Sequence, residues 1–178
     1  DSRERDVTRH QIDTGLNSPL TSSMGRLFDA VSALTGTCSL VTYEGQAAME
    51  LEAVADMTER GTYPWVAGEA RDEIDTRPLI RAVVSDLRSG VTAGVVSARF
   101  HRTVAEIVVD TAARLRGESG IEVVALSGGV FQNVTLLGLC DDYLRRRGFR
   151  VLTQRLVPCN DGGVSLGQAA VAAAIHGG

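Results

Sequence analysis

Apolar residues recur at spacings of three and four in four segments of the first two thirds of the chain, a pattern typical of helices that bury one face. The first of these segments follows hydroxyl residues that can cap a helix, and it ends at Gly36. Its expected buried stripe is Met24, Leu27, Phe28, Val31 and Leu34. We expect the other three helices over residues 46–60, 78–90 and 93–116.

Two segments of the same region lack this periodicity. Residues 1–17 are polar and predict a tail or a short edge strand, so we expect a polar N-terminal segment followed by a lobe formed by residues 18–178. Pro64, Gly68 and scattered charges predict a loop or short irregular strands over residues 62–76. The chain begins without methionine, which suggests a piece of a longer polypeptide.

The last third of the chain has a different pattern, in which strands and helices alternate. A β-branched run over residues 121–126 predicts a strand, and a helix over 132–147, a strand over 149–153 and an alanine-rich helix to Ile175 follow. This order predicts a parallel α/β unit. Because the carboxyl ends of parallel strands meet at one edge of a sheet, the two loops that follow the strands should lie together and face a ligand.

The amino-acid composition excludes several classes of partner and of reaction. The chain has 22 acidic and 18 basic side chains and a net charge of -4, so it lacks the broad positive field that attracts nucleic acid or anionic membranes. Every basic residue among those 18 is arginine, which excludes a lysine Schiff base or a phosphate-loop lysine. No apolar run approaches the ~20 residues of a membrane span. The three cysteines match no zinc or disulfide spacing, so a reducing cytoplasm fits best.

A glycine turn after the first predicted strand is a candidate binding site. Gly128 and Gly129 let the backbone approach a phosphate or ribose closely at the start of a helix, where N–H groups favour anions. Asn133 adds an amide that can donate to and accept from a base or sugar edge. The alternative is that the glycines only permit a tight turn between strand and helix.

Asp161 follows the second predicted strand, so it should lie beside this glycine turn. A carboxylate in such a loop can bind a metal ion, and the two glycines after it suggest close backbone approach. The alternative is that Asp161 only caps the following helix. Glu44 lies at the predicted start of a helix, where an acidic side chain interacts favourably with the helix dipole. Glu50 lies more than one turn further along, so the dipole explains it less well. His101 lies alone in a predicted helix, and we assign no chemistry to it.

Five segments together resemble one family: SPLTSSMGRLFDAV, TYEGQAAMELE, ARFHRTVAEIV, VALSGGVFQN and VPCNDGGVSLGQA. They are similar to the HypF-type carbamoyltransferases of [NiFe]-hydrogenase maturation, and the resemblance covers residues 18–174. More distantly they resemble threonylcarbamoyl-transferring enzymes of tRNA modification. The resemblance implies an α/β fold, namely the C-terminal lobe of a two-lobed, actin-like or Hsp70-like ATPase, helix-rich with a small, largely parallel sheet.

The resemblance also implies an activity for the full protein. Carbamoyl phosphate and ATP give carbamoyl-adenylate, and the carbamoyl group passes to the C-terminal cysteine of a partner maturation protein. Asp161 matches the family's aspartate ligand for a divalent metal, zinc or iron. The positions that match contacts to ATP or carbamoyl-adenylate are Gly128, Gly129 and Asn133 at the nucleotide turn, Asp29 and Glu50 at the ribose, and, less closely, Gly45.

One half of the family's site has no match in this sequence. The other metal ligands of the family are two histidines in an HHxAH-like motif of the N-terminal lobe, and the chain has no such motif. We therefore expect a lobe that binds nucleotide weakly by itself and does not turn over. Two alternatives stay open: a tRNA-modifying relative, and a non-catalytic packing or dimerisation lobe whose apolar surface drives self-association.

Overall fold

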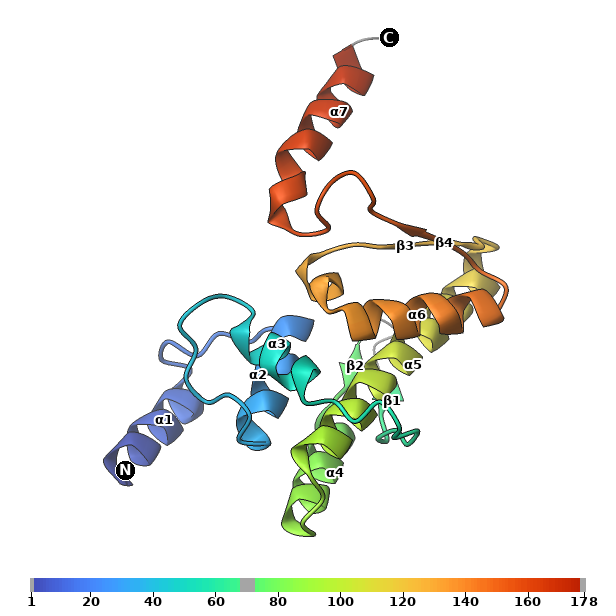
Figure 1. Ribbon diagram of the computed structural model, residues 1–178. Coiled ribbons are helices and arrows are strands. Elements are labelled where there is room, and N and C mark those ends of the chain that lie inside the picture. Colours follow the sequence, from blue (N-terminus) through green and yellow to red (C-terminus); the bar gives the residue numbers. More distant parts are fainter. Residues whose placement is uncertain (1, 68–72, 177–178) are drawn as a thin grey trace.

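The computed structural model describes residues 2–67 and 73–176, and Figure 1 shows how their elements are arranged. In chain order these elements are α1 (Ser2–Thr14), α2 (Met24–Leu34), α3 (Gln46–Ala53), β1 (Val66–Ala67), β2 (Ile74–Asp75), α4 (Arg77–Arg88), α5 (Ala93–Ser119), β3 (Val123–Leu126), the 3-10 helix η1 (Gly129–Gln132), α6 (Val134–Arg146), β4 (Arg150–Thr153), the 3-10 helix η2 (Asp161–Gly163) and α7 (Val164–His176). Helices dominate this lobe.

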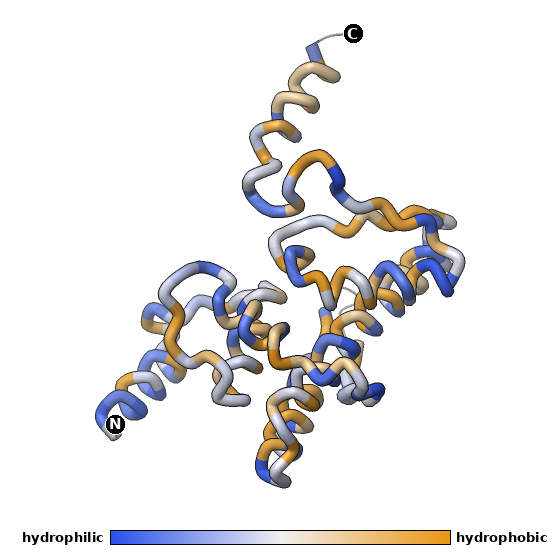
Figure 2. Tube along the Cα trace, in the orientation of Figure 1, coloured by the Kyte–Doolittle hydropathy of each residue, from blue (hydrophilic) through white to orange (hydrophobic). Residues whose placement is uncertain are grey.

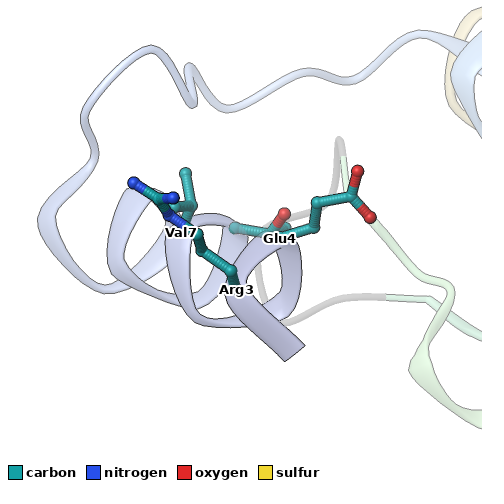
Figure 3. A pocket seen from close by; sticks show the side chains of 4 residues that line it. Arg3, Glu4 and Val7 are labelled. Atoms are coloured by element: carbon teal, nitrogen blue, oxygen red, sulfur yellow. The ribbon is translucent and has the colours of Figure 1, made fainter. Parts of the chain in front are cut away.

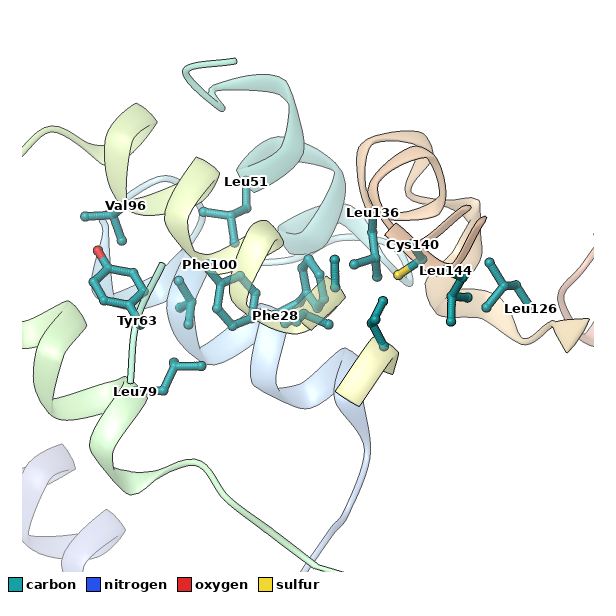
Figure 4. Packing of buried hydrophobic residues seen from close by; sticks show 14 of the residues in the cluster. Phe28, Leu51, Tyr63, Leu79, Val96, Phe100, Leu126, Leu136, Cys140 and Leu144 are labelled. Carbon is teal, nitrogen blue, oxygen red and sulfur yellow. The ribbon is translucent and has the colours of Figure 1, made fainter. Parts of the chain in front are cut away.

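The long helix α5 lies at the centre of the lobe and contacts α3, α4 and α6. Its apolar positions complete a core whose fully buried members include Phe28, Leu79, Phe100 and Leu136 (Figure 4). The rings of Phe28 and Phe100 meet edge to face, with centroids 4.7 Å apart. Each such side chain contributes roughly 1.5–3 kcal/mol when it is removed from water, so these contacts hold α2 and α4 against α5.

Strands β3 and β4 form a parallel two-stranded sheet, in register from Val123 opposite Arg150 to Leu126 opposite Thr153. Leu126 and Val151 are buried in the same core cluster as Leu144 of α6, which connects the two strands. The predicted parallel α/β unit is therefore confirmed, and with it the helix-rich α/β fold class. A short antiparallel pair, β1 with β2, accounts for the predicted irregular strands. Gly68 lies outside the described residues.

The prediction of a tail or an edge strand before residue 18 was wrong, because α1 occupies Ser2–Thr14. The segment has no apolar periodicity, but three of its residues are arginine, a good helix former, and no glycine or proline interrupts it before Gly15. Most side chains of α1 are exposed. The helix therefore forms without a buried face, which is why periodicity did not predict it.

The predicted helix over residues 46–60 ends at Ala53. The chain then turns to meet the start of α5, where Asp56 N donates to Gly94 O at 2.9 Å. A Cβ at Gly94 would lie 2.7 Å from Val54 O, so this close approach requires glycine. The predicted burial of Leu34 was also wrong, since 42% of its surface is exposed at the end of α2.

Helix α7 differs from the other apolar helices because it has no buried residue within its described length. Figure 2 shows that apolar positions continue along it. Leu166, Val171 and Ile175 are each more than half exposed. Within residues 2–67 and 73–176, no helix combines the length and apolar character needed to cross a membrane.

Candidate functional site

The loops that follow β3 and β4 lie against each other, as the order of strands and helices predicted. Gly128 N donates a hydrogen bond to Cys159 O at 2.8 Å, and Gln154 Nε2 donates to Ser127 Oγ at 2.7 Å. These bonds join one loop to the other at the carboxyl ends of two paired strands. Any ligand bound at this edge of the sheet therefore meets both loops.

The glycine turn is open and leads into a 3-10 helix. Gly128 has φ of 101° and ψ of 160°, a backbone conformation that residues other than glycine rarely adopt. A Cβ at Gly128 or Gly129 would meet no atom within 4 Å, so free space borders the turn. The first amides of η1, from Gly129 and Val130, have no acceptor within that helix and can face an anion.

Asn133 lies between η1 and α6, and its side chain is directed into the protein. Its Oδ1 accepts from Leu136 N at 2.8 Å, and its Nδ2 lies 2.8 Å from His101 Nε2. Only 8% of the residue is exposed. Because both ends of the amide have internal partners, this position does not fit the expected contact with a base or a sugar edge. The side chain instead caps α6.

His101 is the residue that sequence reasoning did not connect to the site. It is fully buried, and its Nδ1 lies 2.8 Å from Ser97 O one turn earlier in α5. The carbonyl can only accept, so Nδ1 carries the proton and Nε2 accepts from the Asn133 amide. Burial lowers the pKa of His101, which favours this neutral form. The only signal in the sequence is its place among the buried positions of α5, beside Phe100 and Val104.

A carboxylate from another helix also reaches the start of α6. Glu52 Oε1, from α3, accepts a hydrogen bond from Thr135 N at 2.7 Å. Together Glu52 and Asn133 accept from Thr135 N and Leu136 N, so two of the free amides at the start of α6 already have acceptors within the protein. An anion is therefore expected at η1 and the glycine turn rather than at α6.

Asp161 begins η2 in the loop after β4, with its side chain exposed. The cap of this short helix is Asn160, whose Oδ1 accepts from Gly162 N at 3.1 Å, so capping does not account for Asp161. A Cβ at Gly163 would lie 2.7 Å from Pro158 O. The close backbone approach that the two glycines after Asp161 suggested is therefore a contact within this loop. The described residues contain no cluster of three or more histidine, cysteine or acidic side chains able to hold a metal.

Asp29 on α2 and Glu50 on α3 act on the same buried thiol. Burial raises the pKa of Cys38, and a hydrogen bond with Glu50 and the charges of Glu50 and Asp29 raise it further. Asp29 pairs with Arg26 at 3.0 Å, and Glu50 accepts from Gln46 Nε2 at 2.7 Å. The structure therefore brings these two carboxylates into one neighbourhood.

Helix α2 places that neighbourhood near the turn. Helix α2, which carries Asp29, contacts η1. Gly45 precedes α3 with φ of 80°, so glycine is required there by the backbone conformation alone. Contact between Gly45 and a nucleotide stays a prediction.

An open hollow on α1 lies apart from these residues. Figure 3 shows the side chains of Arg3, Glu4 and Val7 that line it. All of its lining residues belong to one exposed helix, and none of the predicted site residues is among them. We assign it no function.

The described residues form a helix-rich α/β lobe, and at the carboxyl ends of its two parallel strands an open glycine turn lies against the loop of Asp161. The family model described as "Carbamoyltransferase, Kae1-like Domain, second subdomain" matches residues 1–168. The chain belongs to the HypF family of carbamoyltransferases, which the sequence motifs indicated.

Curated relatives from distant organisms support this assignment. "Carbamoyltransferase HypF" of Rhodobacter capsulatus is 42% identical over 172 residues, which are 96% of this chain and 22% of the relative. The protein of the same name from Synechocystis is 41% identical over 155 residues, 85% of this chain and 19% of the relative. "Probable carbamoyltransferase HypF" of Methanocaldococcus jannaschii is 30% identical over 166 residues, 93% and 22% respectively. The chain spans about a fifth of the length of these relatives.

Two solved structures have the same fold. The crystal structure of full-length HypF in its phosphate- and nucleotide-bound form is 45% identical, with a TM-score of 0.91 over all of this chain and 24% of that protein. HypF of T. kodakarensis is 28% identical, with a TM-score of 0.81 over 95% of this chain and 22% of that protein. The lobe is therefore a part of the HypF architecture.

Proposed function

We propose that this chain is the nucleotide-binding lobe of a HypF-type carbamoyltransferase that acts in [NiFe]-hydrogenase maturation in the cytoplasm. In the complete protein, carbamoyl phosphate and ATP give carbamoyl-adenylate, and the C-terminal cysteine of a partner maturation protein accepts the carbamoyl group. The observation that carries this proposal is the hydrogen bond from Gly128 N to Cys159 O, which holds an open glycine turn against the loop of Asp161. The nucleotide-bound form of a HypF relative supports it.

The phosphates of the nucleotide fit the turn better than any helix terminus nearby. Gly128 and Gly129 border free space, and the first amides of η1 can donate to phosphate oxygens. Asp29 and Glu50 would hold the ribose, because carboxylates accept hydrogen bonds from hydroxyl groups. Gly45 would border the same ligand. Asn133 serves this site by shaping the turn, because its amide is bonded inside the lobe.

Asp161 would supply one ligand to a divalent ion, zinc or iron, whose other ligands lie outside this chain. The carboxylate is exposed and is not needed as a helix cap, so it is free to face a neighbouring lobe. A bound ion there would polarise the carbamoyl carbonyl toward a thiolate. Hydrolysis of carbamoyl phosphate gives carbamate and inorganic phosphate, attack of the carbamate oxygen on the α-phosphate of ATP displaces pyrophosphate, and thiolate attack on the carbamoyl carbon of the adenylate displaces AMP. The lobe's own contribution is to orient the adenylate for that attack.

The test uses the full-length protein that contains this lobe, together with a peptide ending in cysteine. We expect Asp161→Ala to abolish carbamoyl transfer to the peptide, measured by mass spectrometry, while circular dichroism shows an unchanged fold. Asp142→Ala is the matched control, because Asp142 is also an exposed carboxylate but lies on α6 and pairs with Arg146. Normal transfer by the Asp161 variant would defeat the metal assignment.

A second measurement separates this function from a non-catalytic packing lobe. Titration of the same protein with α,β-methylene-ATP should shift the amide resonances of Gly128 and Gly129. Resonances of α4, which lies away from the turn, serve as the internal reference (Figure 1). An unchanged spectrum at the turn would favour the packing role.

A further inference from the structure

His101 is a buried polar side chain for which the proposed reaction has no use. The rings of Phe28 and Phe100 lie against it, with centroid distances of 5.2 and 6.1 Å. A buried imidazole is costly unless its nitrogens are hydrogen-bonded. Both are bonded here, Nδ1 to Ser97 O and Nε2 to the Asn133 amide, each at 2.8 Å. The ring therefore forms a connection between α5 and the start of α6.

This connection sets the orientation of the Asn133 amide. Because Nε2 of His101 accepts, the NH2 group of Asn133 must face the ring. The carbonyl oxygen of the same amide then faces Leu136 N and accepts a hydrogen bond from it at 2.8 Å. A flipped amide would direct its NH2 group at the Leu136 N–H, two donors against each other. Only one orientation is compatible with both partners.

The same residue also ends η1. Asn133 N donates to Val130 O at 3.2 Å, and Phe131 N donates to Gly128 O at 3.0 Å, so a short run of bonds leads from the capped amide back to the glycine turn. None of the four residues of η1 is fully buried, and only Val130 and Phe131 are half-buried against the core. The anchor at Asn133 therefore adds to this partial packing in fixing the position of η1.

We infer that His101 is a positioning residue that holds η1 and the Gly128–Gly129 turn in the nucleotide-binding orientation by fixing the amide of Asn133. The identity of the ligand rests on the proposed function. His101 touches neither the nucleotide nor the carbamoyl group, so it acts on binding geometry and not on the reacting atoms. Its loss should raise the KM for ATP more than it lowers kcat.

The first test compares His101→Leu with His101→Gln in the full-length protein. Leucine removes the acceptor, whereas the glutamine Oε1 can replace the imidazole Nε2 as the acceptor for the Asn133 amide. We expect the leucine variant to bind α,β-methylene-ATP about tenfold more weakly by calorimetry, which is the loss typical of one buried hydrogen bond. The glutamine variant should bind within about twofold of wild type. His10→Leu, a change of an exposed histidine on α1, is the matched control.

Wild-type affinity in the leucine variant, or equal weakening of binding in both variants, would overturn the inference. Hydrogen exchange provides a readout that needs no ligand: the amides of residues 129–136 should exchange faster in the leucine variant and recover in the glutamine variant. Should the wild-type protein fail to bind the analogue, the proposed function fails, and exchange alone decides whether His101 holds the turn.

Asn133→Asp tests the same contact if the leucine variant does not fold. Aspartate still caps Leu136, but its other oxygen can accept from Nε2 of His101, while Nδ1 still donates to Ser97 O, only when the ring is protonated. Glu52 of α3 is the charged group that acts on the ring. Its neighbours from α2 and from the start of α6, Phe28 and Asn133, do not titrate. Affinity for the analogue should therefore be weak at about pH 8 and recover at about pH 6, and a pH-independent affinity would contradict the proposal.

Discussion

Glu52 and Thr135, 83 positions apart in the sequence, meet where the carboxylate of α3 caps the first turn of α6, with Oε1 accepting from Thr135 N at 2.7 Å. A carboxylate at a helix N-terminus satisfies a backbone donor and interacts favourably with the helix dipole. This bond joins the lobe's first part to its α/β unit, beside the loop proposed to bind nucleotide.

Replacement of Glu52 by alanine should therefore destabilise the lobe. The loss of a capping acceptor leaves Thr135 N without its partner and costs about 1–2 kcal/mol. The measurement is the free energy of unfolding from hydrogen exchange of core amides in the full-length protein. Glu44→Ala, which changes an exposed acidic residue just before α3, is the control and should have little effect. Equal stability of the two variants would show that the bond is not formed.

Mild acid should weaken the fold through His101. Burial lowers the pKa of His101 below 6.5, although the hydrogen bond from its Nδ1 to Ser97 O and the charge of Glu52 oppose the shift. The unfolded chain then binds a proton that the folded chain does not, so the free energy of unfolding falls as pH drops below 6.5 and stops falling below the folded pKa. The loss is at most about 1.4 kcal/mol for each pH unit.

The measurement for this prediction compares wild type with His101→Gln over a series of pH values. Glutamine does not titrate, so the stability of the variant should fall less steeply over this range. Asp56, Glu59 and Asp75 have lowered pKa values and lose their contributions at lower pH, in both proteins alike. Parallel curves for the two proteins would assign the acid response to other groups.

Periodicity predicted the elements of this lobe because most of them bury one face. The stripe on α2 and the order of β3, α6 and β4 could be inferred from residues within one element. The helix before residue 18 has no such face, so periodicity could not predict it. The end of α3 depends on a close approach to Gly94, far along the chain, which the residues of α3 do not reveal.

The candidate site was predictable in its loops but not in its side-chain directions. The glycines and Asp161 lie at neighbouring strand ends because topology requires it. Asn133 was placed correctly at a helix start, yet its amide faces inward because His101, 32 residues earlier, supplies a partner there. A contact of that kind depends on how α5 packs against α6, which no local pattern encodes.

The two glycines of the turn should respond differently to alanine. Gly128 has φ of 101°, and a side chain in such a conformation costs on the order of 1–3 kcal/mol. Gly129 lies in a helical turn with open space around it, so Gly129→Ala should fold normally. If the turn contacts nucleotide, the added methyl group should still weaken binding of α,β-methylene-ATP. Calorimetry on the full-length variants decides this, and unaltered affinity in Gly129→Ala would remove the turn from the binding site.

Gly163 should matter for transfer without touching the ligand. An alanine Cβ there would lie 2.7 Å from Pro158 O, closer than real contacts allow, so the loop of residues 158–163 must shift and carry Asp161 with it. We expect Gly163→Ala to reduce carbamoyl transfer to the cysteine peptide by about tenfold or more, since catalysis is sensitive to displacements near 1 Å. Gly167→Ala, in open space on α7, is the matched control. Because Gly128 N is bonded to Cys159 O in the same loop, nucleotide binding should weaken as well, and a variant with intact transfer would show that the position of Asp161 is not critical.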